Sequence, residues 1–284
     1  MIFAARTGTR NWTLAVGAAA VSALTAAALG SMPSAAATCV SLFGLGSGGP
    51  CTSSMTSLAI AIGENAEAHA DGILGAAVTL GNSSSASTVA GALFNLAVTL
   101  GNDNEATAGG IASVALVANA IRQTVIAGVD DLTSGSIGNL AVSIGGPEEA
   151  GTIANGIANA AINFAGSGSV YARGVGLTTI NVVGLRSTLY NAGSFNTIAN
   201  VIGNNNYISN LDAQGGAANL AFNVIGSDNG IYTSGALAIA GAVGSTGQTV
   251  IQNNPGINVS FNRQSAASPA SNPRSVSART RGSR

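Results

Sequence analysis

Residues 57–63 read SLAIAIG, and the phrase returns as AAVTLG at 76–81, NLAVTLG at 95–101 and NLAVSIG at 139–145. Looser copies are NAAINFAG at 159–166, INVVG at 180–184, IANVIG at 198–203, FNVIG at 222–226 and AIAGAVG at 238–244. Each copy is a short alternating run that stops at a glycine. Apart from a gap after Gly101, consecutive stops stand 18 to 23 residues apart, as from Gly203 to Gly226. A regular period of this length is typical of stacked coils.

The alternation inside each copy predicts a β-strand. In NLAVTLG, Leu96, Val98 and Leu100 point to one side of the strand, and Ala97 and Thr99 point to the other. Small alanines in the interior favour a narrow, flattened coil. Glycine at each stop supplies the positive φ that a sharp corner needs. The expected corner glycines are Gly63, Gly81, Gly101, Gly145, Gly184, Gly203 and Gly226.

A second apolar segment follows each corner. Five residues after the glycine the chain has a small or apolar residue, preceded by polar residues typical of turns. These return positions are Ala68, Ala86, Ala106 and Ala150 in the first copies and Leu189, Ile208 and Ile231 in later ones. Matching asparagines such as Asn82, Asn102 and Asn204 are placed to stack along the axis. The pattern predicts an all-β fold, a single-stranded β-solenoid (β-helix or β-roll) of about ten coils over residues 57–262.

One segment has a competing interpretation. Residues 110–128 (GIASVALVANAIRQTVIAG) place Ile111, Val114, Ala118, Ile121 and Val125 at helical spacing. The segment falls in the gap where a strong copy is missing, so a short helical insert is an alternative there. Pro147 and the two glutamates after it also have the composition of a first helical turn.

The two ends differ from the repeats. Arg6 and Arg10 precede an apolar stretch over 12–30, and residues 34–37 (SAAA) offer the small side chains of a cleavage site. We therefore expect residues 1–37 to be an export signal cleaved after Ala37, leaving no transmembrane anchor. The alternatives are an uncleaved anchor and a lipidated Cys39. Residues 263–284 are rich in Ser, Pro and Arg, which predicts a disordered basic tail.

Export makes the two cysteines informative. Cys39 and Cys51 are the only pair, and an exported chain meets oxidising conditions. A disulfide between them would cap the segment 38–56 and contribute roughly 2–3 kcal/mol in the chain-entropy model. The alternative is a redox or metal pair, but a metal site needs more ligands than two thiols and one distant His69.

The charges are unevenly distributed. All ten basic residues are arginines, and only Arg122, Arg173 and Arg186 lie in the body, beside all eleven acidic residues. Nucleic acid requires a basic footprint, so an acidic body excludes it as the expected partner. The basic tail is either a solvated solubility segment or a contact to anionic envelope polymers or lipid.

Few residues indicate chemistry. Two acidic doublets, at 130–131 and 148–149, stand 18 residues apart, and a coil of that length would place them side by side. A glycosidase needs such a carboxylate pair in a cleft, whereas acidic doublets beside glycines are ordinarily solvated turns. His69 has no partner serine in a GxSxG turn, and the acidic turns at 101–105 and 226–230 are too isolated to predict calcium. We expect no catalytic residue, metal or cofactor.

The export signal, the CVSLFGLGSGGPC loop and the opening SLAIAIGENAEAHADG together resemble exported Ala/Gly-rich repeat proteins of mycobacteria. That resemblance covers residues 1–165 and implies a location rather than an activity. The phrase SxAIAIGxxAxA is also similar to the β-roll heads of trimeric autotransporter adhesins, although this chain has longer repeats and no heptads.

These observations predict a non-enzymatic exported scaffold. It would act at the cell surface, in the envelope or in the medium by interaction or display, with an envelope or host component as partner and self-association allowed. The alternative from another class is a secreted polysaccharide lyase or hydrolase on a β-helix.

Overall fold

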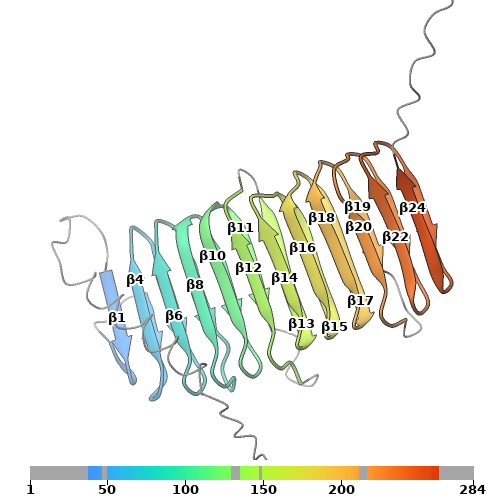
Figure 1. Ribbon diagram of the computed structural model, residues 1–284. Helices are drawn as coiled ribbons and strands as arrows, with labels where there is room; N and C mark the ends of the chain where they lie inside the picture. The colour runs from blue at the N-terminus through green and yellow to red at the C-terminus, as the bar shows by residue number, and fades with distance from the viewer. Residues whose placement is uncertain (1–37, 47–49, 129–134, 147–148, 211–215, 262–284) are drawn as a thin grey trace, which may run out of the picture.

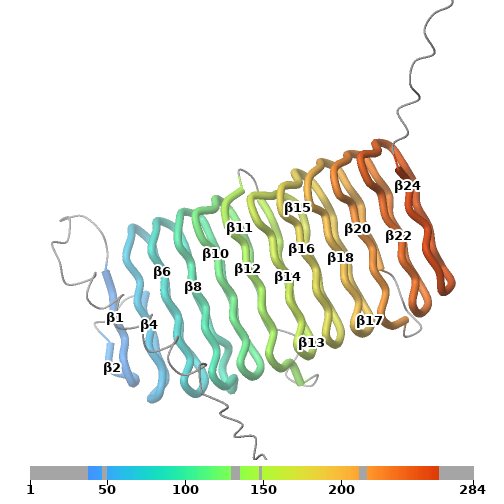
Figure 2. The backbone as a smooth tube through the Cα atoms, in the orientation of Figure 1, coloured from blue at the N-terminus to red at the C-terminus, as the bar shows by residue number. Residues whose placement is uncertain are grey.

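The computed structural model describes residues 38–46, 50–128, 135–146, 149–210 and 216–261, and within them the chain forms a two-sheet β-solenoid (Figure 1). Each coil places one strand in sheet A and the next in sheet B, and the chain advances by one strand spacing per coil (Figure 2). Ten complete coils run from β4–β5 to β22–β23. The predicted all-β solenoid of about ten coils is confirmed. The predicted signal at 1–37 and tail at 263–284 lie outside the described residues.

Sheet A has thirteen strands: β1 (Thr38–Leu42), β2 (Leu45–Gly46), β4 (Leu58–Ile62), β6 (Ala76–Leu80), β8 (Leu96–Asn102), β10 (Val114–Ile121), β12 (Leu140–Ile144), β14 (Ala160–Phe164), β16 (Thr178–Val183), β18 (Thr197–Ile202), β20 (Leu220–Asn223), β22 (Ala238–Val243) and β24 (Gly256–Phe261). Sheet B has eleven: β3 (Cys51–Ser53), β5 (Glu67–Ala70), β7 (Ser85–Thr88), β9 (Glu105–Ala108), β11 (Gln123–Ala127), β13 (Ala150–Ile157), β15 (Gly168–Val175), β17 (Ser187–Ser194), β19 (Tyr207–Asn210), β21 (Gly230–Thr233) and β23 (Thr249–Gln252).

The interior between the sheets is lined by small side chains in the N-terminal coils, and larger apolar residues such as Leu189, Ile198 and Ile208 are fully buried there in the C-terminal coils. In β8, Ala97 and Thr99 are fully buried, whereas Leu96, Val98 and Leu100 lie half-buried on the outer face. The parallel register repeats this arrangement because Ala97 pairs with Ala77 and Ala115 in the neighbouring coils. Two sheets joined by corners of a few residues leave a gap that alanine, serine, threonine and asparagine fill at close-packed density.

The alternative of a short helical insert at 110–128 is wrong, because β10 and β11 occupy this segment. Val117 and Val125 are fully buried, while Ile111 and Ile121 are 41% and 51% exposed. The alternation is of period two, but a bulge next to Ala118 and a corner at Arg122 with φ 53° each restart it in a new phase. Apolar residues then recur at spacings of three and four, which imitates a helix. The first helical turn predicted at Pro147 and the two glutamates after it includes residues 147 and 148, which lie outside the described residues.

The inner row of sheet B matches the predicted return positions with one exception. Its members in coil order are Cys51, Ala68, Ala86, Ala106, Val125, Thr152, Val170, Leu189, Ile208, Ile231 and Val250. Thr152 holds the place expected for Ala150, which instead pairs with Gln123. The corner after β12 contains two consecutive glycines, Gly145 and Gly146, and Thr152 follows Gly145 by seven residues, so the fixed offset of five residues fails there.

Asparagine ladders run along the axis inside the C-terminal half. The side chains of Asn163, Asn181, Asn200 and Asn223 are fully buried and stand one coil apart in register. Each also donates from Nδ2 to the carbonyl of the glycine three residues later, as Asn181 does to Gly184 at 3.1 Å. Buried amides therefore tie each strand to its own corner and to the next coil.

The asparagines expected to stack, Asn82 and Asn102, lie instead at the corner between sheets A and B. The Asn82 backbone N–H donates to Oδ1 of Asn102 at 3.0 Å, and the Glu64 N–H donates to Oδ1 of Asn82 at 2.9 Å. Asn204 accepts from the Leu185 N–H in the same way, at 3.0 Å. Asn82 and Asn102 stand one coil apart as predicted, but each amide bonds a neighbouring backbone rather than another amide. Asn204 has Leu185 and Ser227 as its neighbours in the adjacent coils, so it does not stack on an asparagine.

The corner glycines lie where successive coils approach most closely. At Gly81, with φ +148°, an added Cβ would stand less than 3.0 Å from the carbonyl of Gly101, and Gly63 and Gly203 make the same approach to the next coil. Gly101 is as close to the carbonyl of Ala120, and Gly184 and Gly226 have no room for a Cβ either. The expected positive φ is wrong at Gly184 and Gly226, where Arg186 (54°) and Ile225 (106°) adopt it instead. Gly145 differs, because a Cβ there meets only ordinary contacts at 3.7 Å or more; its neighbour Gly146 makes the close approach.

Candidate functional site

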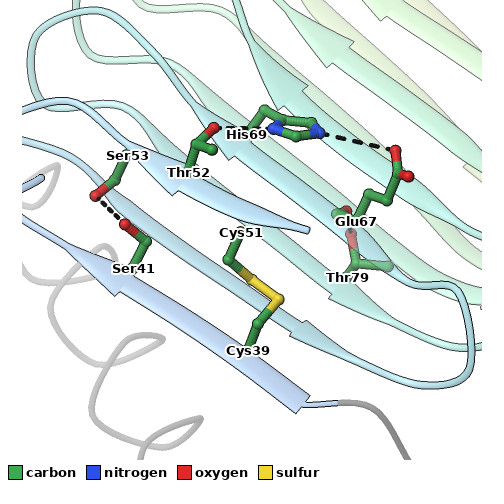
Figure 3. Close-up of a disulfide and its surroundings, with 8 residues drawn as sticks. All are labelled: Cys39, Ser41, Cys51, Thr52, Ser53, Glu67, His69 and Thr79. Carbon is green, nitrogen blue, oxygen red and sulfur yellow. Dashed lines mark hydrogen bonds and ion pairs between the residues drawn. A yellow bond between two sulfur atoms is a disulfide. The ribbon is translucent and has the colours of Figure 1, made fainter. Parts of the chain in front are cut away.

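The N-terminal end of the solenoid is closed by a disulfide cap (Figure 3). β1 runs antiparallel to β4 and so interrupts the parallel ladder. Cys39 on β1 and Cys51 on β3 are bonded, with Cα atoms 5.6 Å apart, and this bond joins sheet A to sheet B. A hydrogen bond of 2.8 Å between Ser41 Oγ and Ser53 Oγ joins the same two strands. The expected disulfide is confirmed, and sheet A ends next to it in the two-residue strand β2, a short edge of the kind that limits pairing with other strands.

His69 lies beside this cap on the outer face of β5. Its Nδ1 is 2.9 Å from Oγ1 of Thr52, and its Nε2 is 3.7 Å from a carboxylate oxygen of Glu67 (Figure 3). The order hydroxyl, imidazole, carboxylate resembles a hydrolytic triad, but the 3.7 Å separation is too long for the hydrogen bond that would orient the ring. His69 and Glu67 are 37% and 56% exposed. We interpret the three side chains as a solvated chain of surface contacts. The contact with Thr52 could not be predicted from the sequence, because Thr52 lies in the neighbouring coil.

A shallow hollow of about 730 Å³ opens on the outer face of sheet B and the corner beside it. Its floor is formed by small residues of β7, β13 and β15, among them Ser85, Gly151 and Ser169. Its charged and aromatic lining consists of Asp103, Glu105, Arg122, Glu149 and Tyr171. Polar hollows of this kind present several hydrogen-bonding groups to a ligand without enclosing it.

Glu149 is the one described member of the two acidic doublets. It lies 3.7 Å from Arg122 Nη1, and the two side chains are 76% and 59% exposed. Asp130, Asp131 and Glu148 lie outside the described residues, so the predicted side-by-side doublets stay a prediction. A glycosidase acid needs a partner carboxylate and a cleft that excludes water, and Glu149 faces open solvent instead.

The outer face of sheet A forms a second candidate site, which we name the aliphatic face. Two of its rows run the length of the solenoid, one through Leu58, Ala76, Leu96, Val114, Leu140, Ala160, Thr178, Thr197, Leu220, Ile239 and Ile257, the other through Ile60, Val78, Val98, Leu116, Val142, Ile162, Ile180, Ala199, Phe222, Gly241 and Val259. A third row runs through Ile62, Leu80, Leu100, Ala118, Ile144 and Phe164. Apart from Thr178 and Thr197, these positions are apolar or glycine, and most are half-buried.

No charged residue lies on any strand of sheet A. The charged side chains of the described residues gather on sheet B and on the corners, as Glu67, Glu105 and Arg122 illustrate. The solenoid therefore has one uncharged aliphatic side and one polar side.

An apolar ridge borders the aliphatic face along the corner that leads into sheet A. Leu74, Phe94, Phe195 and Leu237 occupy this corner with φ between 54° and 57°. They are 52%, 60%, 67% and 64% exposed, respectively. A left-handed backbone costs a bulky L-residue roughly 1–2 kcal/mol, and glycine would remove that cost. Large apolar side chains held in strained, exposed positions point to a role in contacts with something outside the coil.

The four tyrosines of the chain lie on the same sheet. Tyr171, Tyr190, Tyr207 and Tyr232 all project from the outer face of sheet B. The rings of Tyr171 and Tyr190 have centroids 6.2 Å apart in adjacent coils. Their phenol groups add to the polar character of this side.

No family model matches the chain, and the searches of curated proteins and of solved structures find no match either. Within the described ranges, no cluster of three or more His, Cys, Asp or Glu side chains is arranged to hold a metal ion. The same residues contain no helix that could span a membrane.

Proposed function

We propose that the protein is an exported, non-enzymatic scaffold that acts by surface contact at the cell surface, in the envelope or in the medium. The observation that carries the proposal is the aliphatic face, an uncharged surface that extends along sheet A. Monomeric soluble proteins rarely expose a contiguous apolar patch larger than about 300–600 Å². Eleven parallel strands spaced about 4.8 Å apart, across about five residues of 3.3 Å, cover roughly 800 Å².

Export is supported by the sequence of residues 1–37 and by the Cys39–Cys51 bond, which suits an oxidising compartment. The test is to fractionate the producing cells into cytoplasm, envelope and medium and to determine the N-terminus of the protein by mass spectrometry. We expect a chain that begins at Thr38 in the envelope or medium. Intact chain beginning at Met1 in the cytoplasm would refute the export proposal.

The contact role has its own test. Replacing Leu116 and Val142 by lysine places two charges at the centre of the aliphatic face, and replacing Ile126 and Ile153 by lysine does the same on sheet B in the same two coils. The proposal expects the first pair, but not the second, to release the protein from the surface or partner that it contacts.

A second candidate is a polysaccharide-active protein, favoured only by the hollow on sheet B with Arg122, Glu149 and Tyr171. This candidate predicts turnover of envelope or host glycans that Glu149→Gln abolishes. Turnover that survives Glu149→Gln would leave the hollow without a catalytic role.

A further inference from the structure

We infer that the partner seated on the aliphatic face is a second copy of this chain, packed sheet A against sheet A about a two-fold axis. The inference rests on the proposed function, because that function makes the aliphatic face the surface that binds a partner. The following observations select a second copy over other occupants.

The first observation is area. A face of roughly 800 Å² on each copy would bury about 1,600 Å² in total, which equals the standard size of a stable protein–protein interface. The apolar ridge at Phe94 and Phe195 borders the face and adds to this area. The apolar character of this face is typical of homodimer interfaces.

The second observation is shape. The strands of sheet A stay nearly parallel from β4 to β24, so the face is close to flat (Figures 1 and 2). Flat sheets of many strands are stabilised by stacking or by side-chain ladders, and sheet A has both inside the solenoid, so its flat outer face is available to a second flat surface. A second copy repeats its side-chain rows with the same strand spacing, so the rows of two copies can interdigitate along the whole length, with the sheets about 10 Å apart.

The third observation is charge. An anionic lipid surface is recognised by lysine or arginine beside the apolar contact, and tyrosine or tryptophan commonly lies at the membrane boundary. The aliphatic face has neither, because Arg122, Arg173 and Arg186 and the four tyrosines lie on sheet B or at the corners. Residues 264–284 are a poor match as well, since they have no apolar periodicity and are rich in Arg and Ser.

The packing is isologous: each copy contributes the same rows, with residues near the axis facing their own equivalents. Leu116 and Val142 pair with each other on β10 and β12, close to the middle of the solenoid. Lysine at both positions would place charges in a dry interface from both copies at once. The matched control is Ile126→Lys with Ile153→Lys, because these residues pair in the same way on β11 and β13 but project from sheet B.

The experiment is sedimentation equilibrium of the protein purified from the producing cells, with circular dichroism and a thermal melt of every variant to confirm that it is folded. We expect the wild type and the sheet B variant to have twice the chain mass. The sheet A variant should sediment as a folded monomer, with self-association weakened about 100-fold or more. A monomeric wild type at tens of micromolar, or a sheet A variant that stays dimeric, would overturn the inference.

Vesicles of phosphatidylcholine with phosphatidylglycerol serve as the competing probe. If the wild type is monomeric and co-sediments with vesicles through Leu116 and Val142, lipid is the occupant and the inference is wrong. That same result would leave the proposed contact function intact. Conversely, the wild type could be a dimer, the sheet A variant a monomer, and both could bind the cell surface or envelope equally well. That result would support the second copy and refute the proposed function.

Discussion

Asn181 donates a hydrogen bond from Nδ2 to Oδ1 of Asn163 across 2.9 Å, one coil away in the interior. Asn200 continues the chain to Asn181 at 2.8 Å, and Asn223 to Asn200 at 2.8 Å. Because every amide is both donor and acceptor, a shift of one coil against the next would break several buried bonds together. The ladder therefore fixes the register of the C-terminal coils.

Asn200→Ala should be among the most damaging asparagine replacements. The side chain of Asn200 also accepts from Asn206 Nδ2 at 3.1 Å, so its removal leaves several buried polar groups without a hydrogen-bond partner. Each buried polar group left unsatisfied lowers the free energy of unfolding by about 1–3 kcal/mol. We expect a clear fall in the midpoint of urea unfolding, whereas Asn254→Ala, at an exposed position, should leave it nearly unchanged. Equal midpoints for the two variants would contradict the ladder.

Replacement of Gly81 by alanine should destabilise far more than the same replacement at Gly91. Both glycines have positive φ, +148° and +78°, but a Cβ at Gly81 collides with the Gly101 carbonyl while a Cβ at Gly91 meets nothing within 4 Å. Gly91→Ala therefore carries only the backbone cost of about 1–2 kcal/mol. Thermal unfolding of the two variants separates the steric term from the conformational one. Matching losses would show that adjacent coils do not approach closely at Gly81.

Removal of the disulfide should loosen the N-terminal cap first. The double variant Cys39→Ser, Cys51→Ser loses a bond that closes a separation of 12 residues, worth roughly 2–3 kcal/mol. In repeat structures a terminal coil depends mainly on its neighbour. Hydrogen exchange should therefore rise in β1 to β4 and change little beyond β10, with dithiothreitol-treated wild type as the parallel sample. Uniform loss of protection along the whole solenoid would argue against a local cap.

The strands and coil number were predictable from the glycine-stopped phrase, because period-two alternation and positive-φ corners are local properties of the chain. Gly81 and Ala86, for instance, hold the places that their spacing predicts. The interior ladder also has a signal in the sequence. An asparagine stands three residues before the glycine at 163/166, 181/184, 200/203 and 223/226.

The positions at which the inward and outward alternation changes phase were not predictable, because they depend on contacts between coils. The bulge next to Ala118 and the corner at Arg122 made two strands resemble a helix, and the double-glycine corner after Ile144 displaced Ala150 from its row. The candidate sites depended on the same long-range placement. Thr52 meets His69 and Arg122 meets Glu149 only because coils stack.

The central claim is that small side chains fill the interior of the N-terminal coils while the larger aliphatic residues of sheet A face outward there. It is tested most directly by comparing the urea midpoints of Ala97→Leu and Val98→Ala, two neighbours on β8 that point to opposite sides. The account predicts that Ala97→Leu overpacks the gap and costs about 1–3 kcal/mol or more, while Val98→Ala costs clearly less. The reverse order, with Ala97→Leu tolerated and Val98→Ala severely destabilising, would place the leucines and valines inside and contradict the account.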